Sequence, residues 1–350
     1  MLVSVVTPAL AWDSRLAATV GSILSQDLPS GVEMEVVVAL ADVAGVPDTI
    51  GVTTFHNRSG TIPDGLNGAI SRSTGEVVVR VDSRCLVQPD HVSRVVRGFE
   101  DPSVGCIGGA ALVLDRGWFG STYAVAFNSI LLGPTVYRYR RRSGPVDTAY
   151  LGAWRRRDLD KLGGFDPRML RNQDNELADR VRAAGMSVWF DCDLVVGYYN
   201  DRSLAGAVRH HNSFGRWRMV QRSQGQRSMT PRHVAALGVA GLGAIAGLVG
   251  LANQRTRRPM ILTGLVAYGG AAATARITSR RLLAVRRDLD VSPPSLAGAT
   301  LAPALAAVLN GAWLAGILFG VRQGPHGGPP DGSDATIATG GDGEQAAASR

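Results

Sequence analysis

The sequence predicts an α/β protein whose mixed, mainly parallel sheet carries helices on both faces, followed by apolar helices that could span a membrane. Two observations predict the sheet: short apolar runs recur over the first 114 residues, and helical segments separate them. Three uncharged apolar segments after residue 233 predict the membrane part. With 350 residues, the chain is long enough for a domain with a full hydrophobic core.

Four apolar runs have the length and composition of buried strands. They are Val3–Pro8, Glu35–Leu40, Glu76–Asp82 and Val104–Leu114. Helical spacing of apolar residues predicts helices at Ser14–Gln26, Asn67–Ser73 and His91–Phe99. Ligands of such sheets lie beyond the carboxyl ends of the strands, so Asp82 is placed to meet a ligand.

The next elements begin with a turn at Gly164–Pro167. A helix is predicted at Asp174–Ala184, where Gly185 ends it, and a short strand at Val188–Phe190. Residues 202–233 are rich in arginine and amphipathic, which predicts a helix lying in a membrane interface.

Three segments are then uncharged: Val234–Ala252 over 19 residues, Met260–Ala275 over 16 and Leu296–Val321 over 26. A membrane span needs roughly 20 residues, so the first and third are long enough and the second is marginal. The alternative is that they are core helices of a soluble domain. We expect a domain at 1–201, an interfacial segment at 202–233, a membrane domain of two or three helices at 234–321, and a disordered tail at 322–350.

The charge distribution indicates the partners. The net charge is +8, and residues 202–287 contain fifteen arginines and no acidic residue. A basic, apolar segment suits the anionic lipids of a membrane surface, and no nucleic-acid-binding motif is present, so we expect no nucleic acid. The three cysteines lack metal-ligand spacing, and the short run Leu2–Leu10 is not expected to be a signal peptide.

Several common catalytic motifs are absent. The chain has no Gly-x-Gly-x-x-Gly after the first strand, no Gly-x-x-x-x-Gly-Lys-Ser/Thr and no Gly-x-Ser-x-Gly. Dehydrogenases, P-loop enzymes and α/β-hydrolases are therefore disfavoured. The remaining candidates are Asp82 at a strand end and Asp174 at a helix start, although a simple helix cap is the alternative for Asp174.

A set of short motifs surrounds these two aspartates. They are Leu66–Ile70 with Thr74–Glu76, Arg80–Arg84, Val146–Ala153, Gly163–Asp166, Arg171–Glu176 and Phe214–Arg218. In this order they resemble the family 2 glycosyltransferases of the GT-A fold, over roughly residues 1–220. The most similar members are membrane-bound exopolysaccharide enzymes of the succinoglycan glucosyltransferase type.

The resemblance implies that Asp174 is the general base of an inverting transfer. It also implies two further sets of contacts. Those to the nucleotide-sugar donor are Pro8, Asp42, Asn67, Arg80, Asp82 and Arg84. Those to the acceptor or the diphosphate are Gln173, Glu176, Arg216 and Trp217. The alternatives are local: helix polarity for Asn67, a strand-edge charge for Arg80, and a membrane-interface role for Trp217.

The chain departs from the family pattern at three places. Arg84 occupies a position where the family has a metal ligand, Asp42 is shifted in register, and Ser213 replaces a glutamine. Either Asp82 holds Mg²⁺ or Mn²⁺ with fewer protein ligands, or Arg84 neutralises the leaving group directly. We expect the metal to be retained. A third interpretation is that Asp82 and Arg84 form an ion pair at the protein surface without a role in binding.

The sequence therefore predicts a multi-pass enzyme of the inner cell membrane with a cytoplasmic catalytic domain. It would transfer a hexose from a nucleotide-diphosphate sugar, expected to be a UDP-sugar, to a lipid-linked saccharide. Its other partners would be membrane lipids and polysaccharide-assembly proteins. Two alternatives are a non-catalytic membrane subunit with the same fold and a processive polysaccharide synthase.

Overall fold

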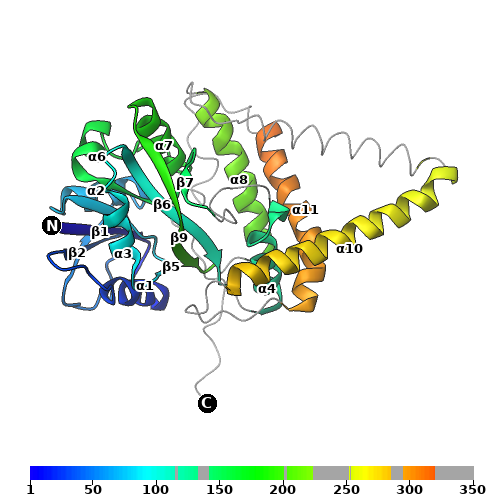
Figure 1. The fold of residues 1–350 in the computed structure, drawn as a ribbon, viewed down its shortest axis with the longest axis horizontal. Helices are drawn as coiled ribbons and strands as arrows, with labels where there is room; N and C mark the ends of the chain where they lie inside the picture. The colour runs from blue at the N-terminus through cyan, green and yellow to red at the C-terminus, as the bar shows by residue number, and fades with distance from the viewer. Residues whose placement is uncertain are drawn as a thin grey trace, which may run out of the picture.

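The computed structural model describes residues 1–114, 117–132, 142–200, 203–223, 252, 254–284 and 295–319. Figure 1 shows a twisted sheet with helices on both sides, next to a group of helices from which α10 projects. The strands are β1 (Leu2–Ala9), β2 (Glu33–Leu40), β3 (Val52–His56), β4 (Val77–Arg80), β5 (Cys85–Val87), β6 (Val104–Val113), β7 (Gly144–Pro145), β8 (Tyr150–Arg155) and β9 (Ser187–Tyr198). The helices packed on the sheet are α1 (Ser14–Leu24), α2 (Ile62–Ser71), α3 (His91–Gly98), α6 (Arg156–Leu162) and α7 (Gln173–Ala183).

The sheet has the order β3-β2-β1-β4-β8-β6-β9-β5, and β7 pairs with β9. Strands β4, β1, β2 and β3 are mutually parallel, as are β6 and β9, whereas β8, β5 and β7 pair antiparallel with their neighbours. The parallel ladders are the longer ones. The predicted mixed, mainly parallel sheet is therefore confirmed.

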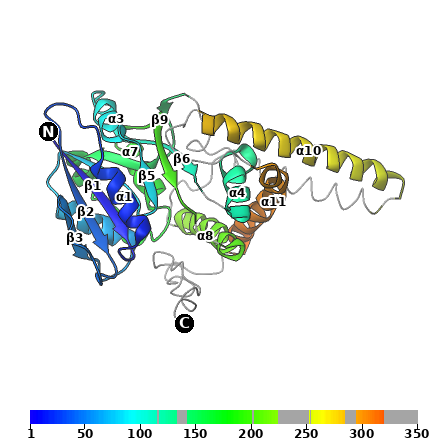
Figure 2. The ribbon, with the colours of Figure 1, turned by 90° about the horizontal axis from the view of Figure 1, so that it is seen from below.

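The two faces of the sheet are covered by different helices because successive side chains of a strand point to opposite faces. Val5 of β1 packs in one cluster with residues of α1 and α3, while Val6 packs in another with residues of α2 and α7. The prediction of helices on both faces is thus correct. Figure 2 shows the same layers from below.

A second group of helices packs beyond the carboxyl end of β6. They are α4 (Gly117–Phe127), the 3₁₀ turn η1 (Ile130–Leu132), α8 (Leu204–Ser223), α10 (Gln254–Ala284) and α11 (Leu296–Phe319). Alanines of α11 and Tyr123 of α4 form a hydrophobic cluster with Ala207 of α8 and Ala275 of α10.

Within the described residues, two helices are long and apolar enough to cross a membrane, at Arg255–Arg280 and Leu296–Phe319. They correspond to the second and third apolar segments of the sequence. The first segment, Val234–Ala252, lies outside the described residues except for its last residue, and so does the tail from 322. Of the expected interfacial segment at 202–233, the structure describes residues 203–223, where α8 forms.

Candidate active site at the carboxyl edge of the sheet

The parallel strands β1, β2 and β4 end at a common edge of the sheet. Ala9 is in register with Leu40, and Val6 is in register with Arg80. Three of the expected donor contacts lie at this edge because of the strands that precede them. Pro8 is the last residue but one of β1, Asp42 follows β2 by two residues, and Asp82 follows β4 by two residues.

Arg80 and Asp82 form a bidentate ion pair at this edge. Arg80 Nε lies 2.7 Å from Asp82 Oδ1, and Nη2 lies 3.0 Å from Oδ2. The guanidinium is buried, with the Arg80 side chain 6% exposed, while Asp82 is 31% exposed. Burial acts to lower the pKa of Arg80, but the charges of Asp82 and Asp174 outweigh it and raise that pKa.

Asp174 thus lies within electrostatic reach of the same guanidinium that holds Asp82. It is half-buried in the first turn of α7, where its Oδ1 accepts a hydrogen bond from the backbone N–H of Asn175 at 2.9 Å. Asp174 also contributes, after burial, to raising the pKa of the Cys106 thiol on β6. Asp174 on α7 is therefore within electrostatic range of the ion pair that Asp82 makes at the end of β4.

Tyr150 is a neighbour of Asp82 that sequence reasoning missed as a site residue. Burial raises the pKa of Tyr150, and the nearby Cys85 and Asp82 raise it further. Its hydroxyl is 3.5 Å from Cys85 Sγ, and the Cys85 backbone N–H donates to the Asp82 carbonyl at 3.0 Å. The next residue, Leu151, has a φ of +46°, which is uncommon for a leucine and marks local strain.

Two of the expected contacts are used inside the protein. The amide of Asn67 makes two hydrogen bonds with the backbone of Phe165, at 2.8 and 2.9 Å. Glu176 is 5% exposed and pairs with Arg180 at 2.6 Å, and Arg180 also donates to the carbonyls of Leu162 and Gly164. Both side chains therefore anchor the 162–165 turn beside α7.

The other expected contacts occupy three positions. Gln173 is buried at the start of α7, one residue before Asp174. Arg216 and Trp217 are half-buried on α8, in the helical group rather than on the sheet. Asp42 is exposed, and its Oδ1 accepts a hydrogen bond from the Ala44 N–H at 2.9 Å. The Asp42 carboxylate therefore caps a local turn.

The carboxylates at this edge do not fit a divalent cation as they stand. Both oxygens of Asp82 are bound by Arg80, and the next candidate position is Arg84, which cannot ligate a metal. In the part of the chain that the structure describes, the acidic or thiol group close enough to share a cation is Asp191–Asp193. It includes neither Asp82 nor Asp174, and Arg94 Nη1 lies 3.9 Å from its first carboxylate.

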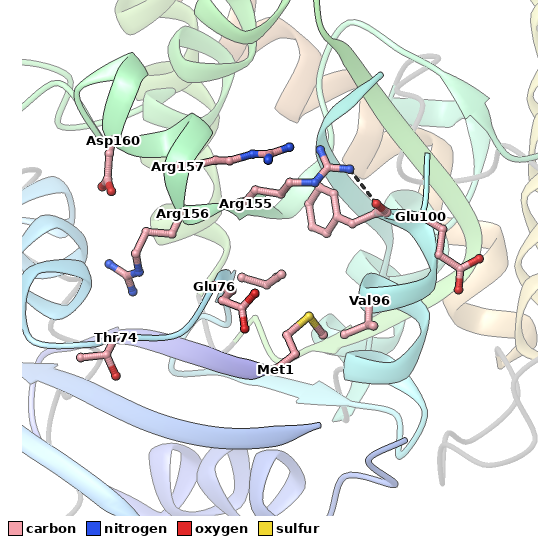
Figure 3. Close-up of a pocket in the computed structure, with 11 residues that line it drawn as sticks. Met1, Thr74, Glu76, Val96, Glu100, Arg155, Arg156, Arg157 and Asp160 are labelled. Carbon is pink, nitrogen blue, oxygen red and sulfur yellow. Dashed lines mark hydrogen bonds between the residues drawn. The ribbon is translucent and has the colours of Figure 1, made fainter. Parts of the chain in front are cut away.

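A pocket lies at the opposite edge of the sheet, where Met1 precedes β1 and Glu76 precedes β4 (Figure 3). Its two central arginines are engaged by the backbone. Arg155 Nη1 donates to the Val104 carbonyl at 2.6 Å, and Arg156 Nε donates to the Gly75 carbonyl at 2.6 Å. They brace the amino ends of the strands, so we do not assign the reaction to this pocket.

Comparison with known proteins shows which family and fold the chain resembles. The sequence profile described as "Glycosyltransferase like family 2" matches residues 2–219. A solved structure of the mannosyltransferase PcManGT from Pyrobaculum calidifontis, in complex with GDP-Man and Mn²⁺, is 20% identical. The match covers 91% of this chain and 87% of that one, with a TM-score of 0.50.

A second solved structure is that of S. aureus TarS in complex with UDP-GlcNAc. It is 14% identical, with 63% of this chain and 67% of that one covered and a TM-score of 0.45. No curated protein matches the chain significantly.

Proposed function

The chain belongs to the glycosyltransferase family 2, and from this premise we propose that it is an inverting hexosyltransferase acting on a lipid-linked acceptor. The observation that carries the proposal is the buried guanidinium of Arg80, which pairs with Asp82 through two hydrogen bonds and is within electrostatic range of Asp174. This group lies at the carboxyl edge of the parallel strands, where ligands of open α/β sheets bind.

In the proposed reaction Asp174 is the general base. It takes the proton of an acceptor hydroxyl while that oxygen forms a bond to the anomeric carbon of the donor sugar. The bond between the anomeric carbon and the diphosphate oxygen breaks, and the electron pair leaves with the nucleoside diphosphate. Attack opposite the leaving group inverts the anomeric configuration. Removing such a base costs about 10²–10⁴-fold in rate.

The proposed donor is a nucleotide-diphosphate sugar. Both solved structures named above hold this class of ligand, GDP-Man in one and UDP-GlcNAc in the other. We assign a UDP-sugar, following the resemblance to exopolysaccharide glucosyltransferases. Pro8 and Asp42 would border the nucleotide, because they lie at the ends of β1 and β2.

The diphosphate charge is proposed to be neutralised by arginine. Arg84 occupies the sequence position where the family has a metal ligand, and both carboxylate oxygens of Asp82 accept hydrogen bonds from Arg80. Arginine binds diphosphate oxygens through charge-assisted hydrogen bonds, so this arrangement favours Arg84 over the Mg²⁺ or Mn²⁺ expected from the sequence.

A chelation assay tests this assignment. We expect turnover to be unchanged by EDTA and not increased by Mn²⁺, and we expect UDP to bind equally well in calorimetry with and without Mn²⁺. A loss of turnover with EDTA that Mn²⁺ restores would instead establish the metal at Asp82.

The acceptor is proposed to be a lipid-linked saccharide at the inner membrane. The support is the exposed apolar surface of α10, where Leu262, Leu265 and Val266 are each more than 60% exposed. The catalytic domain at 1–201 would then lie in the cytoplasm, and α8 would lie in the membrane interface. The membrane region at 234–321 would follow, and then the tail at 322–350. Polysaccharide-assembly proteins would be further partners.

The decisive test of the proposed function measures released nucleoside diphosphate from membranes given a series of nucleotide-sugars. Asp174→Asn should lower turnover by about 10²–10⁴-fold, since an amide cannot take the proton. Asp160→Asn is the matched control, because Asp160 is exposed on α6 and lines the opposite edge of the sheet. Equal activity of the two variants would refute Asp174 as base. A ladder of products instead of a single addition would indicate a processive synthase.

A further inference from the structure

The helix that carries Asp174 begins with an unusual residue. Asn172 is the N-cap of α7 and has a φ of +59° and a ψ of +20°, a left-handed conformation. Asparagine tolerates this region better than most residues, but it still requires support from its surroundings. The first hydrogen bond of the helix runs from the Glu176 N–H to the Asn172 carbonyl at 3.0 Å. The direction of the first turn, and so of Asp174, depends on this cap.

The support comes from α8, a helix of the other group. Asn172 Nδ2 donates a hydrogen bond to Gln221 Oε1 at 3.2 Å, and the two side chains are buried, with Gln221 1% exposed. A buried amide pair of this kind is costly to leave half-made, because either group alone would remain unsatisfied. Gln221 therefore fixes the side chain, and with it the backbone, of the residue two positions before Asp174.

A second contact between the same two segments lies next to the first. Arg171 Nη1 is 3.4 Å from His210 Nδ1, and its guanidinium lies 5.9 Å from the ring centre of Phe214. His210 and Phe214 themselves pack edge to face at 4.5 Å. The chain entering α7 is thus held by α8 at two successive residues.

We propose that Gln221 is a positioning residue for the reaction, which holds Asp174 in its productive orientation through the left-handed cap Asn172. Gln221 does not touch the reacting atoms. The inference rests on the proposed role of Asp174 as general base, and it adds that α8, which packs along α11, sets the geometry of that base.

A double-mutant cycle tests the proposal. Gln221→Leu removes the hydrogen bond at nearly constant volume, and Asn172→Gly removes the same bond while keeping the positive φ available. Each variant should lower kcat by about 10–100-fold with an unchanged KM for the donor, because misplacing a reacting group by about 1 Å costs up to that much. The double variant should be no worse than the poorer single one, since both changes remove one interaction.

The control is Arg222→Ala, which alters the exposed neighbour of Gln221 on the same turn of α8 and should retain wild-type kcat. The proposal would be overturned if Gln221→Leu kept the wild-type kcat, or if the donor KM rose and kcat did not fall. It would also be overturned if the losses of the two single variants multiplied in the double variant. Asp174→Asn, run in parallel, separates the two claims. If it is fully active, the proposed base is wrong; if it is inactive while Gln221→Leu is normal, only the positioning role fails.

Discussion

At the scale of single residues, the arrangement of charge around Arg80 explains how two acidic side chains can share one edge of the sheet. The Arg80 guanidinium is buried and therefore weakly screened by solvent, and the charges of Asp82 and Asp174 both raise its pKa. Removing Asp82 would leave the buried Arg80 guanidinium without its paired carboxylate, which is costlier than never having formed the pair. Arg80 is thus both a structural cation and part of the proposed donor site.

His91 gives a prediction about acid stability. Burial lowers its pKa to about 4 against an ordinary 6.5, only partly opposed by Asp90, and neither ring nitrogen has a hydrogen-bond partner in the described structure. The unfolded chain therefore takes up a proton as the pH falls below 6.5, whereas the folded protein does so only near pH 4. Stability should fall across this window, by about 3 kcal/mol in full.

Thermal unfolding of detergent-solubilised protein between about pH 7 and pH 4 measures this effect. His91→Leu should flatten the pH dependence, because leucine does not titrate. His56→Gln is the control, since His56 is exposed and its loss should leave the profile as steep as in the wild type. A wild-type slope in His91→Leu would contradict the assignment.

Sequence reasoning reached Asp82 and Asp174 because each stands at the end of a regular pattern, a strand in one case and a helix in the other. In the structure Asp82 pairs with Arg80, and Asp174 is within electrostatic range of the same side chain, while their proposed roles in the reaction stay predictions. Tyr150 and Asn172 were not predicted as functional, since their importance comes from backbone conformation and from contacts with distant segments. Both residues lie within motifs recognised from the sequence, Val146–Ala153 and Arg171–Glu176, but a motif alone does not show which of its members make these contacts.

At the scale of elements, the predicted strands and helices of the first 114 residues are present, although α2 begins at Ile62 instead of Asn67 and ends at Ser71. The strand predicted at Val188–Phe190 extends further in the structure, as β9 at Ser187–Tyr198. The prediction was too short because Asp191–Asp193 interrupts the apolar run, at a point where the pairing with β6 is irregular. Helix α4 was missed because its mostly apolar sequence shows no helical periodicity, and β3 was missed because it is half-exposed.

The crossing of α8 and α11 depends on two glycines. A Cβ at Gly215 would collide with the Trp313 carbonyl, and one at Gly316 would collide with the Asn212 carbonyl. Asn212 Nδ2 also donates to the Ala312 carbonyl at 3.0 Å across the same contact. Glycine at these points lets the two backbones approach closely, as is common between membrane helices.

Gly316→Ala should therefore destabilise the protein by about 1–3 kcal/mol, as expected for overpacking. Gly311→Ala on the same helix is a matched control, because no atom lies within 4 Å of the position that an alanine Cβ would take there. That substitution should be neutral or stabilising, up to about 1 kcal/mol, from helix propensity alone. Thermal unfolding of the two variants side by side decides the matter: equal melting temperatures would mean that the helices do not cross as closely as the structure indicates.

At the scale of the whole molecule, a mixed sheet with helices on both faces is joined to helices whose outer surface is apolar. In the apolar stretch of α10 that could cross a membrane, 6% of the residues are buried within the protein, whereas in that of α11 the share is 33%. In a soluble protein such a surface would be an aggregation hazard, whereas in a bilayer it is the expected lipid-facing surface. Figure 1 and Figure 2 both show α10 projecting from the rest of the described chain.

The same surface gives a prediction for localisation. The full chain should remain in the membrane pellet after washes with high salt and alkaline carbonate, and only detergent should release it, because lipid rather than surface charge would hold it. Replacing Leu262, Leu265 and Val266 of α10 by aspartate should shift protein toward the soluble fraction, since each charge near the centre of a span costs about 2.5–3.5 kcal/mol. Replacing them by alanine should leave the protein in the pellet. Release of the unmodified chain by salt alone would show that it lies on the membrane through its arginines, and α10 would then require another partner for its apolar face.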